Sequence, residues 1–361
     1  MTDAAEPPTG RGSRPGPSPR SETSLRDVAR LAGVSPSTAS RVVSGSSHPV
    51  SEESRARVLE AARNLRFQPN RLARALATAR SQTIGVLVHD AADPYFAQII
   101  RGIEDIVGEH DHALFVASSD RDLETELACI SAFHSHQVDA IVLAASGMAS
   151  PDYADEIAGL LDRFVDRGGV VVSLSTGSYP APGVHVDNQD VAATATRHLI
   201  ELGHRRIAYL AGPGQLLVTR ERRQGYQTAL AEAGIGIDPG IVFESGFTLE
   251  GGREMSEMIL AAPGTTGVVA ANDLVAIGAI RGLMDHGLTV PDDISVVGID
   301  DILFTDYAPV PLTTVRIPLI ELGRVGARMV MALLRGETVG DQVLAHRLVI
   351  RSSTAPPRGR G

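Results

Sequence analysis

Residues 24–45 constrain the chain most, because they have the pattern of two short amphipathic helices joined by a tight turn. Apolar residues recur at helical spacing in the first helix, and Ser24 is followed three residues later by Asp27, as in a capping box. Gly33 ends this helix, and Ser35 is a favourable cap for the second. The pattern predicts a helix-turn-helix.

The second predicted helix leaves short polar side chains exposed at its start. Hydroxyl groups bond phosphates or base edges, and an Arg can bond guanine through two hydrogen bonds, so this surface suits readout of the DNA major groove. The exposed residues are Pro36, Ser37, Ser40 and Arg41. We therefore predict a DNA-reading head; the alternative is an ordinary helical hairpin.

A third helix, beginning at Ser51, is expected to complete the head. Two acids follow at once, where the helix dipole favours negative charge. We expect this helix to bury Val58, Leu59, Ala62 and Leu65. The helix-turn-helix domain then spans residues 24–68, and the Pro-, Gly- and Ser-rich residues 1–23 are expected to form a disordered tail.

Residues 69–81 have the composition of a short basic helix. Pro69 interrupts the preceding helix, and Asn70 can cap a new one of about two turns, which is marginal on its own. Because apolar residues alternate with Arg, Leu76 is placed to wedge between minor-groove base steps while the arginines contact phosphates. We expect a hinge that orders only on DNA; the alternative is a plain basic linker.

The charge is spread unevenly along the chain. The 361 residues carry a formal charge of −10, which by itself would argue against a polyanionic partner. Residues 1–80, however, hold 13 Arg against seven acids, which gives +6 and leaves −16 for residues 81–361. The basic part is therefore the part with the predicted DNA-reading helices.

The composition disfavours several classes of protein. No apolar run reaches the roughly 20 residues that span a bilayer, and residues 1–23 lack the apolar stretch of a signal peptide. Cys129 is the only cysteine, so it supports no disulfide framework, and we expect it to be a buried apolar residue. The His pairs at 110–112 and 134–136 are expected to be solvated rather than metal-binding. We expect a cytoplasmic protein with no membrane contact, cofactor or metal.

From Thr83 onward, apolar β-branched runs alternate with helical patterns. We expect each run to be a buried strand followed by a helix of ten or more residues, which predicts parallel sheets with helices on both faces. The length suits two similar lobes, with a ligand at the carboxyl ends of the strands. The runs are residues 84–88, 113–118, 140–145, 170–174, 206–212, 266–272 and 295–300.

Long motifs follow one another in a distinctive order, among them SLRDVARLAGVSPSTASRVVSG, HLIELGHRRIAYLAGP, VVAANDLVAIGAI and DISVVGIDD. This order closely resembles the LacI/GalR family of bacterial transcription regulators, over nearly all of residues 23–357. The resemblance implies an N-terminal all-α helix-turn-helix head and an α/β, two-lobed effector domain like a periplasmic binding protein.

For the head, the resemblance implies a homodimer on a pseudo-palindromic double-stranded DNA operator, controlled by a small-molecule effector. The recognition helix starts at Ser35, and the base contacts fall on Pro36, Ser37 and Arg41. The phosphate contacts fall on Ser24, Thr38, Ser40 and Asn70, and the minor-groove wedge falls on Leu76.

For residues 82–357, the resemblance implies two lobes joined by three crossovers, with an effector cleft between them. The N-lobe comprises about 82–185 and 315–341, and the C-lobe about 186–314 and 342–357. Carboxylate, amide and guanidinium groups bond hydroxyls while aromatic rings cover apolar faces, so the cleft suits a sugar or related metabolite. The cleft positions are Asp93, Tyr95, Phe96, Arg222, Phe247, Asn272 and Asp300.

Four of these positions also have a purely structural interpretation. Asp93 precedes a proline and suits a helix cap, and Phe96 suits a core. Asn272 suits the start of a helix. Asp300 competes with Asp301 for the cleft, and we prefer Asp300.

Two departures from the family limit what the resemblance implies. Where some sugar-responsive members carry an acid after the fourth strand, residues 173–176 are Ser-Leu-Ser-Thr, which leaves the identity of the effector open. After residue 357 there is no apolar heptad tail, so nothing supports a leucine-zipper tetramer.

Two other functions share parts of the pattern. A periplasmic solute-binding protein has the two-lobed fold, but it needs a signal peptide and has no DNA-reading head. An α/β enzyme needs a catalytic motif, and neither a G-x-S-x-G nor a Walker A nor a G-x-G-x-x-G sequence is present. We therefore predict a transcription regulator that acts as a repressor.

Overall fold

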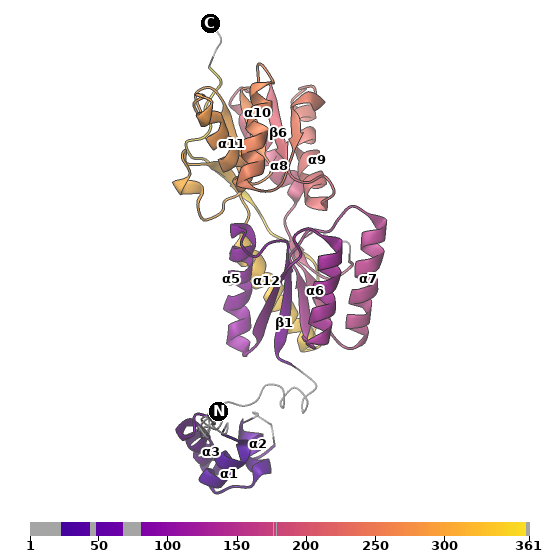
Figure 1. The fold of residues 1–361 in the computed structure, drawn as a ribbon, viewed down its shortest axis with the longest axis vertical. Helices are drawn as coiled ribbons and strands as arrows, with labels where there is room; N and C mark the ends of the chain where they lie inside the picture. Colours follow the sequence, from indigo (N-terminus) through magenta and orange to yellow (C-terminus); the bar gives the residue numbers. More distant parts are fainter. Residues whose placement is uncertain (1–22, 44–47, 68–80, 176, 178, 359–361) are drawn as a thin grey trace, which may run out of the picture. The chain divides into compact units, whose positions relative to one another are not determined.

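The computed structural model describes residues 23–43, 48–67, 81–175, 177 and 179–358. The chain divides into two compact units, Met1–Ala79 and Arg80–Gly361 (Figure 1). Each unit has its own hydrophobic core. The expected tail lies almost wholly outside the described residues, as do Asn70 and Leu76 of the expected hinge.

The described residues of the first unit form three helices: α1 (Leu25–Ala32), α2 (Pro36–Val43) and α3 (Glu52–Asn64). The capping box is present, since the Ser24 side chain accepts from the Asp27 backbone while the Asp27 side chain accepts from the Ser24 backbone. Gly33 ends α1 with a φ of 64°, a left-handed conformation that glycine adopts without strain. The helix-turn-helix prediction is confirmed.

The third helix starts after Ser51 as expected, but it buries a different set of side chains. Val58 and Ala61 are buried, whereas Leu59 is 45% exposed. Ala62 and Leu65 are half-buried at the side of the core. The prediction for Leu59 was wrong because residues one apart on a helix point about 100° apart, so Ala61, three residues beyond Val58, shares its face.

The second unit begins with a parallel four-stranded sheet in the order β2-β1-β3-β4, which we call the N-lobe sheet. The two inner strands, β1 and β3, are buried along their whole length. Helices α5 and α12 cover one face and α6 and α7 the other (Figure 1). The bounds are β1 (Thr83–Val88), α5 (Pro94–Val107), η1 (Gly108–His110), β2 (Ala113–Ser118), α6 (Leu123–Ser135), β3 (Ala140–Leu143), α7 (Pro151–Asp166), β4 (Val170–Ser173) and α12 (Leu319–Leu334).

The C-lobe contains a six-stranded sheet in the order β12-β10-β9-β8-β6-β7, in which only β12 is antiparallel to its neighbour. Helices α8 and α9 pack together, as do α10 and α11. The bounds are α8 (Asn188–Glu201), β6 (Ile207–Ala211), α9 (Leu217–Glu232), η2 (Pro239–Ile241), β7 (Val242–Glu244), α10 (Leu249–Leu260), β8 (Gly267–Ala270), α11 (Asp273–Asp285), β9 (Ser295–Asp300), η3 (Thr305–Tyr307), β10 (Thr313–Arg316) and β12 (Arg347–Val349). The short strands β5 (Val184–His185) and β11 (Gln342–Val343) pair with each other.

All seven predicted strands are present, but β2 is not buried as expected, since Phe115 and Val116 on it are 42% and 40% exposed. As the edge strand of its sheet, β2 has a neighbouring strand on one side only. The helix expected after residues 295–300 is not present. The chain instead makes the short helix η3 and continues as β10. Pro309 and Pro311 account for this, because proline lacks the N–H that a helix interior needs. The strand β10 also lies in the C-lobe sheet, so the chain returns to the N-lobe after Arg316 rather than at residue 315.

The return helix α12 lies very close to α5. A Cβ added to Gly102 would lie 2.0 Å from the Ile320 carbonyl oxygen, and one added to Gly323 would lie 2.1 Å from that of Ile99. Glycine on both helices lets the two backbones come into contact. This contact holds α12, which is distant in sequence, against the first part of the same lobe.

Two expectations about single features can be compared with the fold. Cys129 is only half-buried, with Sγ 3.7 Å from the Ser118 carbonyl oxygen, so the prediction of a buried residue was wrong. It lies beside the edge strand β2, which leaves one side open. None of the described helices is both long and apolar enough to cross a membrane.

Candidate functional site

The start of α2 gathers three hydroxyl groups. The Ser35 Oγ accepts from the Thr38 backbone N–H at 3.1 Å and lies 2.8 Å from the hydroxyls of both Ser37 and Thr38. These oxygens lie at the positive end of the helix dipole, where Pro36 has no N–H and the Thr38 and Ala39 N–H groups already donate to Ser35. The hydroxyl groups, rather than a set of free backbone N–H groups, are what this helix start offers to a phosphate.

The residues of α2 predicted to meet base edges, Pro36, Ser37 and Arg41, are exposed, as is Ser40, a predicted phosphate contact. Ala39 and Val42 face the core of the head. The division follows from helical periodicity, since the core contacts use one stripe and leave the other side for a partner.

Ser24 is exposed, but its polar groups are already used. Its hydroxyl lies 2.7 Å from Asp27 Oδ2, and its backbone N–H donates to the same oxygen at 3.1 Å. Asp27 places negative charge beside the position where the resemblance puts a phosphate contact. A phosphate at Ser24 must therefore compete with the capping box.

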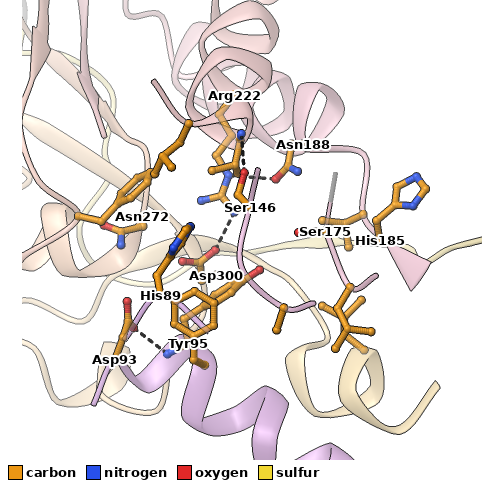
Figure 2. Close-up of a pocket in the computed structure, with 18 of the residues that line it drawn as sticks. His89, Asp93, Tyr95, Ser146, Ser175, His185, Asn188, Arg222, Asn272 and Asp300 are labelled. Carbon is orange, nitrogen blue, oxygen red and sulfur yellow. Dashed lines mark hydrogen bonds and ion pairs between the residues drawn. The ribbon is translucent and has the colours of Figure 1, made fainter. Parts of the chain in front are cut away.

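In the second unit, a cavity opens between the two lobes where the strands end (Figure 2). It holds about 650 Å³ of empty space, part of which is open to solvent. All seven predicted cleft residues line it: Asp93, Tyr95, Phe96, Arg222, Phe247, Asn272 and Asp300. Those from the N-lobe lie at the start of α5, and the others come from four segments of the C-lobe.

Arg222 is the organising residue of the cavity and is only 3% exposed. Its Nε donates to Asn188 Oδ1 at 3.1 Å, and one terminal nitrogen donates to Asp300 Oδ1 at 3.1 Å. The other terminal nitrogen donates to the Ala271 carbonyl oxygen. These three acceptors come from separate segments, so the guanidinium fixes their relative positions.

The ambiguity between Asp300 and Asp301 is resolved by their partners. The Asp301 carboxylate is held by Arg316 and Arg351 and accepts from the Thr305 hydroxyl. Asp300 instead lines the cavity and pairs with Arg222. Burial raises the pKa of Asp300 to about 7, although the Arg222 charge works in the opposite direction.

Asp93 and Asn272 are helix caps that also line the cavity. Asp93 caps α5 by accepting from the Tyr95 N–H at 2.9 Å, and Asn272 caps α11 by accepting from the Val275 N–H at 2.9 Å. Each cap uses one oxygen, so the second oxygen of Asp93 and the amide nitrogen of Asn272 remain for a ligand. Burial raises the pKa of Asp93.

Aromatic rings from both lobes meet the cavity. Tyr95 and Phe96 form an edge-to-face pair with ring centroids 5.0 Å apart. Phe247 lies over Gly212, where an added Cβ would come within 2.2 Å of its ring. The Arg121 guanidinium lies 6.0 Å from the centre of the Phe247 ring, which makes a cation–π contact between the lobes.

The sequence interpretation missed several lining residues, including His89, Arg121, Ser146, His185 and Asn188. Ser175, in the segment after the fourth strand that the sequence singled out, also lines the cavity. The His89 ring is 3% exposed, and its Nε2 has no hydrogen-bond partner among the described residues. Burial, assisted by the charge of Arg121, lowers its pKa to about 3, so the ring is neutral. A signal was available, since His89, Arg121 and Ser146 all follow strand ends, where open α/β sheets bind ligands.

The described residues contain no group of three His, Cys, Asp or Glu side chains placed to hold a metal ion. In the two His-X-His motifs, His110 and His112 each place Nδ1 near a backbone carbonyl oxygen, and the His136 ring packs edge-on against Phe115. The side chains that line the cavity offer hydrogen bonds and aromatic contacts.

Two family models match the chain. Residues 24–70 match the bacterial regulatory proteins of the lacI family, and residues 196–354 match a periplasmic binding protein-like domain. The first match covers the helix-turn-helix, and the second covers most of the C-lobe with α12.

Known proteins resemble the chain over nearly its full length. The transcriptional regulator RegA of Clostridium saccharobutylicum is 34% identical over 92% of this chain and 99% of its own. A complex of the transcriptional regulator CelR with cellobiose is 32% identical, with a TM-score of 0.67, over 92% of this chain and 99% of that one. The lac repressor dimer bound to operator and the anti-inducer ONPF is 28% identical, with a TM-score of 0.81, over the same shares. This chain belongs to the LacI family of bacterial transcription regulators and carries a periplasmic-binding-protein-like effector domain.

Proposed function

We propose that the protein is a homodimeric repressor that binds a pseudo-palindromic operator. A sugar or related metabolite in the cleft raises or lowers the affinity of the repressor for this operator. The observation that carries this proposal is the buried Arg222–Asp300–Asn188 cluster at the floor of a cavity between two lobes. A polyol offers the donors and acceptors that such a cluster needs, and the aromatic rings cover its apolar faces. Operator binding also places the protein in the cytoplasm.

On DNA, α2 enters the major groove. Ser37 and Arg41 contact base edges, and Pro36, which has no side-chain donor or acceptor, contacts an apolar group such as a thymine methyl. Ser35 is the first residue of this recognition segment, and the hydroxyls of Thr38 and Ser40 bind phosphates. Ser24 contributes a phosphate contact only where the phosphate outcompetes Asp27.

The hinge residues Asn70 and Leu76 complete the DNA contacts. By resemblance, Asn70 binds a phosphate and Leu76 enters the minor groove, where an apolar wedge unstacks a base step and bends the duplex. Leu76→Ala should weaken specific operator binding far more than non-specific binding. Titrations of an operator duplex and a scrambled duplex would measure this difference, and equal losses on both would contradict the wedge role.

The second copy of the chain is expected along β2. This strand is the edge of the N-lobe sheet, yet Phe115 and Val116 on it are 42% and 40% exposed. Unpaired strand edges with exposed apolar residues require cover, and a symmetric second copy supplies it. The lac repressor, which is similar in structure, is a dimer on its operator.

The effector acts through the relative position of the lobes. Because lining residues come from both lobes, a bound ligand favours one arrangement over another by the contacts it makes in each. The hinge precedes β1 in the N-lobe, so a shift of that lobe separates paired hinge helices and removes their share of the operator affinity. This coupling is reciprocal, and DNA must also change the affinity for effector.

An operator selected from random duplex DNA allows the effector role to be tested by fluorescence anisotropy in the presence of monosaccharides and glycosides. Asn272→Asp keeps the cap on α11 but replaces the amide donor with a carboxylate. We expect it to abolish the effector response and leave operator affinity unchanged. Asp122→Asn, a cap change at the exposed start of α6, is the matched control. A normal response of the Asn272→Asp protein would overturn the cleft assignment.

A further inference from the structure

Helix α9, which carries Arg222, begins without a capping side chain of its own. Its N-cap position is Leu216, whose side chain is buried and has no atom that could accept a hydrogen bond. The first N–H groups of a helix find no acceptor within the helix, so they need one from elsewhere. Most of the described helices supply it from their own N-cap residue, as Asp122, Thr248 and Asn272 do for α6, α10 and α11.

The acceptors for α9 come instead from the N-lobe, in the loop that follows β3. The Leu217 N–H donates to the Gly147 carbonyl oxygen at 3.0 Å, and the Val218 N–H donates to Ser146 Oγ at 3.2 Å. Leu217 and Val218 are the first two residues of α9. Because a serine hydroxyl is among the most favourable N-cap groups, this loop caps α9 from the opposite lobe.

Two further backbone contacts join the same segments. The Ala149 N–H donates to the Gln215 carbonyl oxygen at 2.7 Å, and Met148 forms an antiparallel β-bridge with Leu216. Each lobe therefore donates hydrogen bonds to the other over residues 146–149 and 215–218, which we call the lobe bridge.

The lobe bridge lies beside the buried cluster of the cavity. Ser146, Leu216 and Val218 line the cavity together with Arg222 (Figure 2). Arg222 follows Val218 by four residues, which is about one helical turn. When the lobes separate, α9 loses the acceptors of its first two N–H groups one turn before the guanidinium that holds Asp300.

We propose that Ser146 and Gly147 are positioning residues that cap α9 only in this arrangement of the lobes, so that lobe closure and the ordering of the first turn of α9 are one event. Opening the lobes exposes that turn to water and loosens the segment that places Arg222 in the cavity. The position of the N-lobe thereby reaches the effector site through two hydrogen bonds. This inference rests on the proposed role of lobe position, and it holds for any effector that occupies the cavity.

Proline at the first position of α9 tests the lobe bridge without weakening the helix. Leu217→Pro replaces the N–H that Gly147 accepts with a ring carbon, whereas proline at a first helical position suits the helix itself. The preceding Leu216 has φ −80° and ψ 137°, an extended conformation that proline tolerates before it. Leu217→Ala removes the side chain and keeps the N–H. Leu249→Pro, at the first position of α10, is the matched control.

The reaction of a single thiol with N-ethylmaleimide, followed by mass spectrometry on the full-length protein, measures how often the cavity opens. Val186 lines the cavity and is only 6% exposed, so Val186→Cys is the reporter. Cys129→Ser removes the one native thiol. We expect Leu217→Pro to raise the labelling rate severalfold, as the loss of one backbone hydrogen bond implies, and Leu217→Ala and Leu249→Pro to leave the rate nearly unchanged.

A second pair of variants tests the cap across the lobes. Ser146→Ala removes the acceptor of the Val218 N–H, and Ser146→Thr keeps a hydroxyl. Hydrogen–deuterium exchange of residues 214–222 measures the order of the first turn of α9. We expect Ser146→Ala to speed both this exchange and the labelling of the reporter, and Ser146→Thr to restore both, while exchange in residues 223–232 stays unchanged.

Three results would overturn the proposal. They are a labelling rate that Leu217→Pro leaves unchanged, an equal rise of that rate in Leu249→Pro, and exchange in Ser146→Thr as fast as in Ser146→Ala. These measurements use neither operator nor sugar, so their failure leaves the proposed effector response standing. A protein whose operator affinity no sugar alters would instead refute the proposed function, while the labelling and exchange results would still stand.

Discussion

The DNA-reading head and the effector cleft solve their binding problems in opposite ways. The head presents exposed residues from one short segment, and its polar groups pair with neighbours two or three residues away. The cleft is built from buried groups. A single hydrogen bond there, from Arg222 to Asp300, joins residues that are 78 positions apart in the sequence. Exposed polar groups stay in contact with water, so their contacts cost little free energy. Buried charges lose that contact and require partners that only the folded chain can bring together.

The largest effect should follow from breaking the buried cluster. Arg222→Ala leaves Asp300 and Asn188 without their donor in a buried site, which costs about 3–5 kcal/mol when one member of a buried pair is removed. Arg220→Ala, at an exposed position on the same helix, should cost less than about 1 kcal/mol. Urea unfolding followed by circular dichroism measures both, and similar losses would contradict the role of Arg222.

The next effect tests whether the two units fail independently. Val28 is fully buried in the small core of the head, and Val28→Ala should cost about 2 kcal/mol from lost burial and the cavity left behind. We expect operator binding to be lost while ligand binding to the cleft is retained. Anisotropy and calorimetry on the same sample check this, and a parallel loss of ligand binding would show that the units are coupled.

A smaller effect concerns the pH dependence of the second unit. The pKa of Asp300 is raised by burial from 3.8 to about 7, so the folded state holds a proton that the unfolded state has released. Stability should therefore fall as the pH rises from about 4 to about 7, and Asp300→Asn should remove this part of the slope. Denaturation at several pH values measures it.

Asp122 provides a control of opposite sign for that experiment. Hydrogen bonds from Thr125 lower its pKa, so its contribution is present at neutral pH and is lost as the pH falls. Asp122→Asn should remove this acid-side loss and leave the slope between pH 4 and 7 intact. An unchanged slope in the Asp300→Asn protein would contradict the assignment of the raised pKa.

The smallest effect distinguishes a cap from a phosphate contact at Ser24. Ser24→Asp keeps an oxygen that can cap α1, but it removes the hydroxyl that donates to Asp27 Oδ2 and adds a second carboxylate beside it, so the head should lose roughly 1 kcal/mol. If a phosphate approaches this residue, the added negative charge should weaken operator binding severalfold at low salt. Unchanged operator affinity would leave Ser24 as a cap alone.

Much of the fold was readable from the sequence because its signals are local. The capping box at Ser24 and the left-handed Gly33 depend on neighbouring residues, and the seven strands depend on uninterrupted apolar runs. The errors arose where the local signal was weak or ambiguous. Leu59 is apolar but faces outward, and β10 replaces a helix in a segment where two prolines alternate with apolar residues.

The cleft was only partly predictable. All seven predicted residues line the cavity. They were predicted from the resemblance to the family, because no local pattern in the sequence links them to one another. His89 and Arg121 were missed although each follows the end of a strand, because the sequence does not show which of the loops after strands reach the cavity. Neither an unpartnered imidazole nitrogen nor a guanidinium over an aromatic ring from the other lobe has any signature along the chain.

The sequence by itself determined the three-helix head, its exposed reading face and the alternating strands and helices, since these follow from capping, periodicity and burial within short windows. Only the tertiary structure decided which aspartate lines the cavity and that Arg222 joins three separate segments. Those properties depend on the strand order and the return of α12, which bring distant residues together and remove them from water.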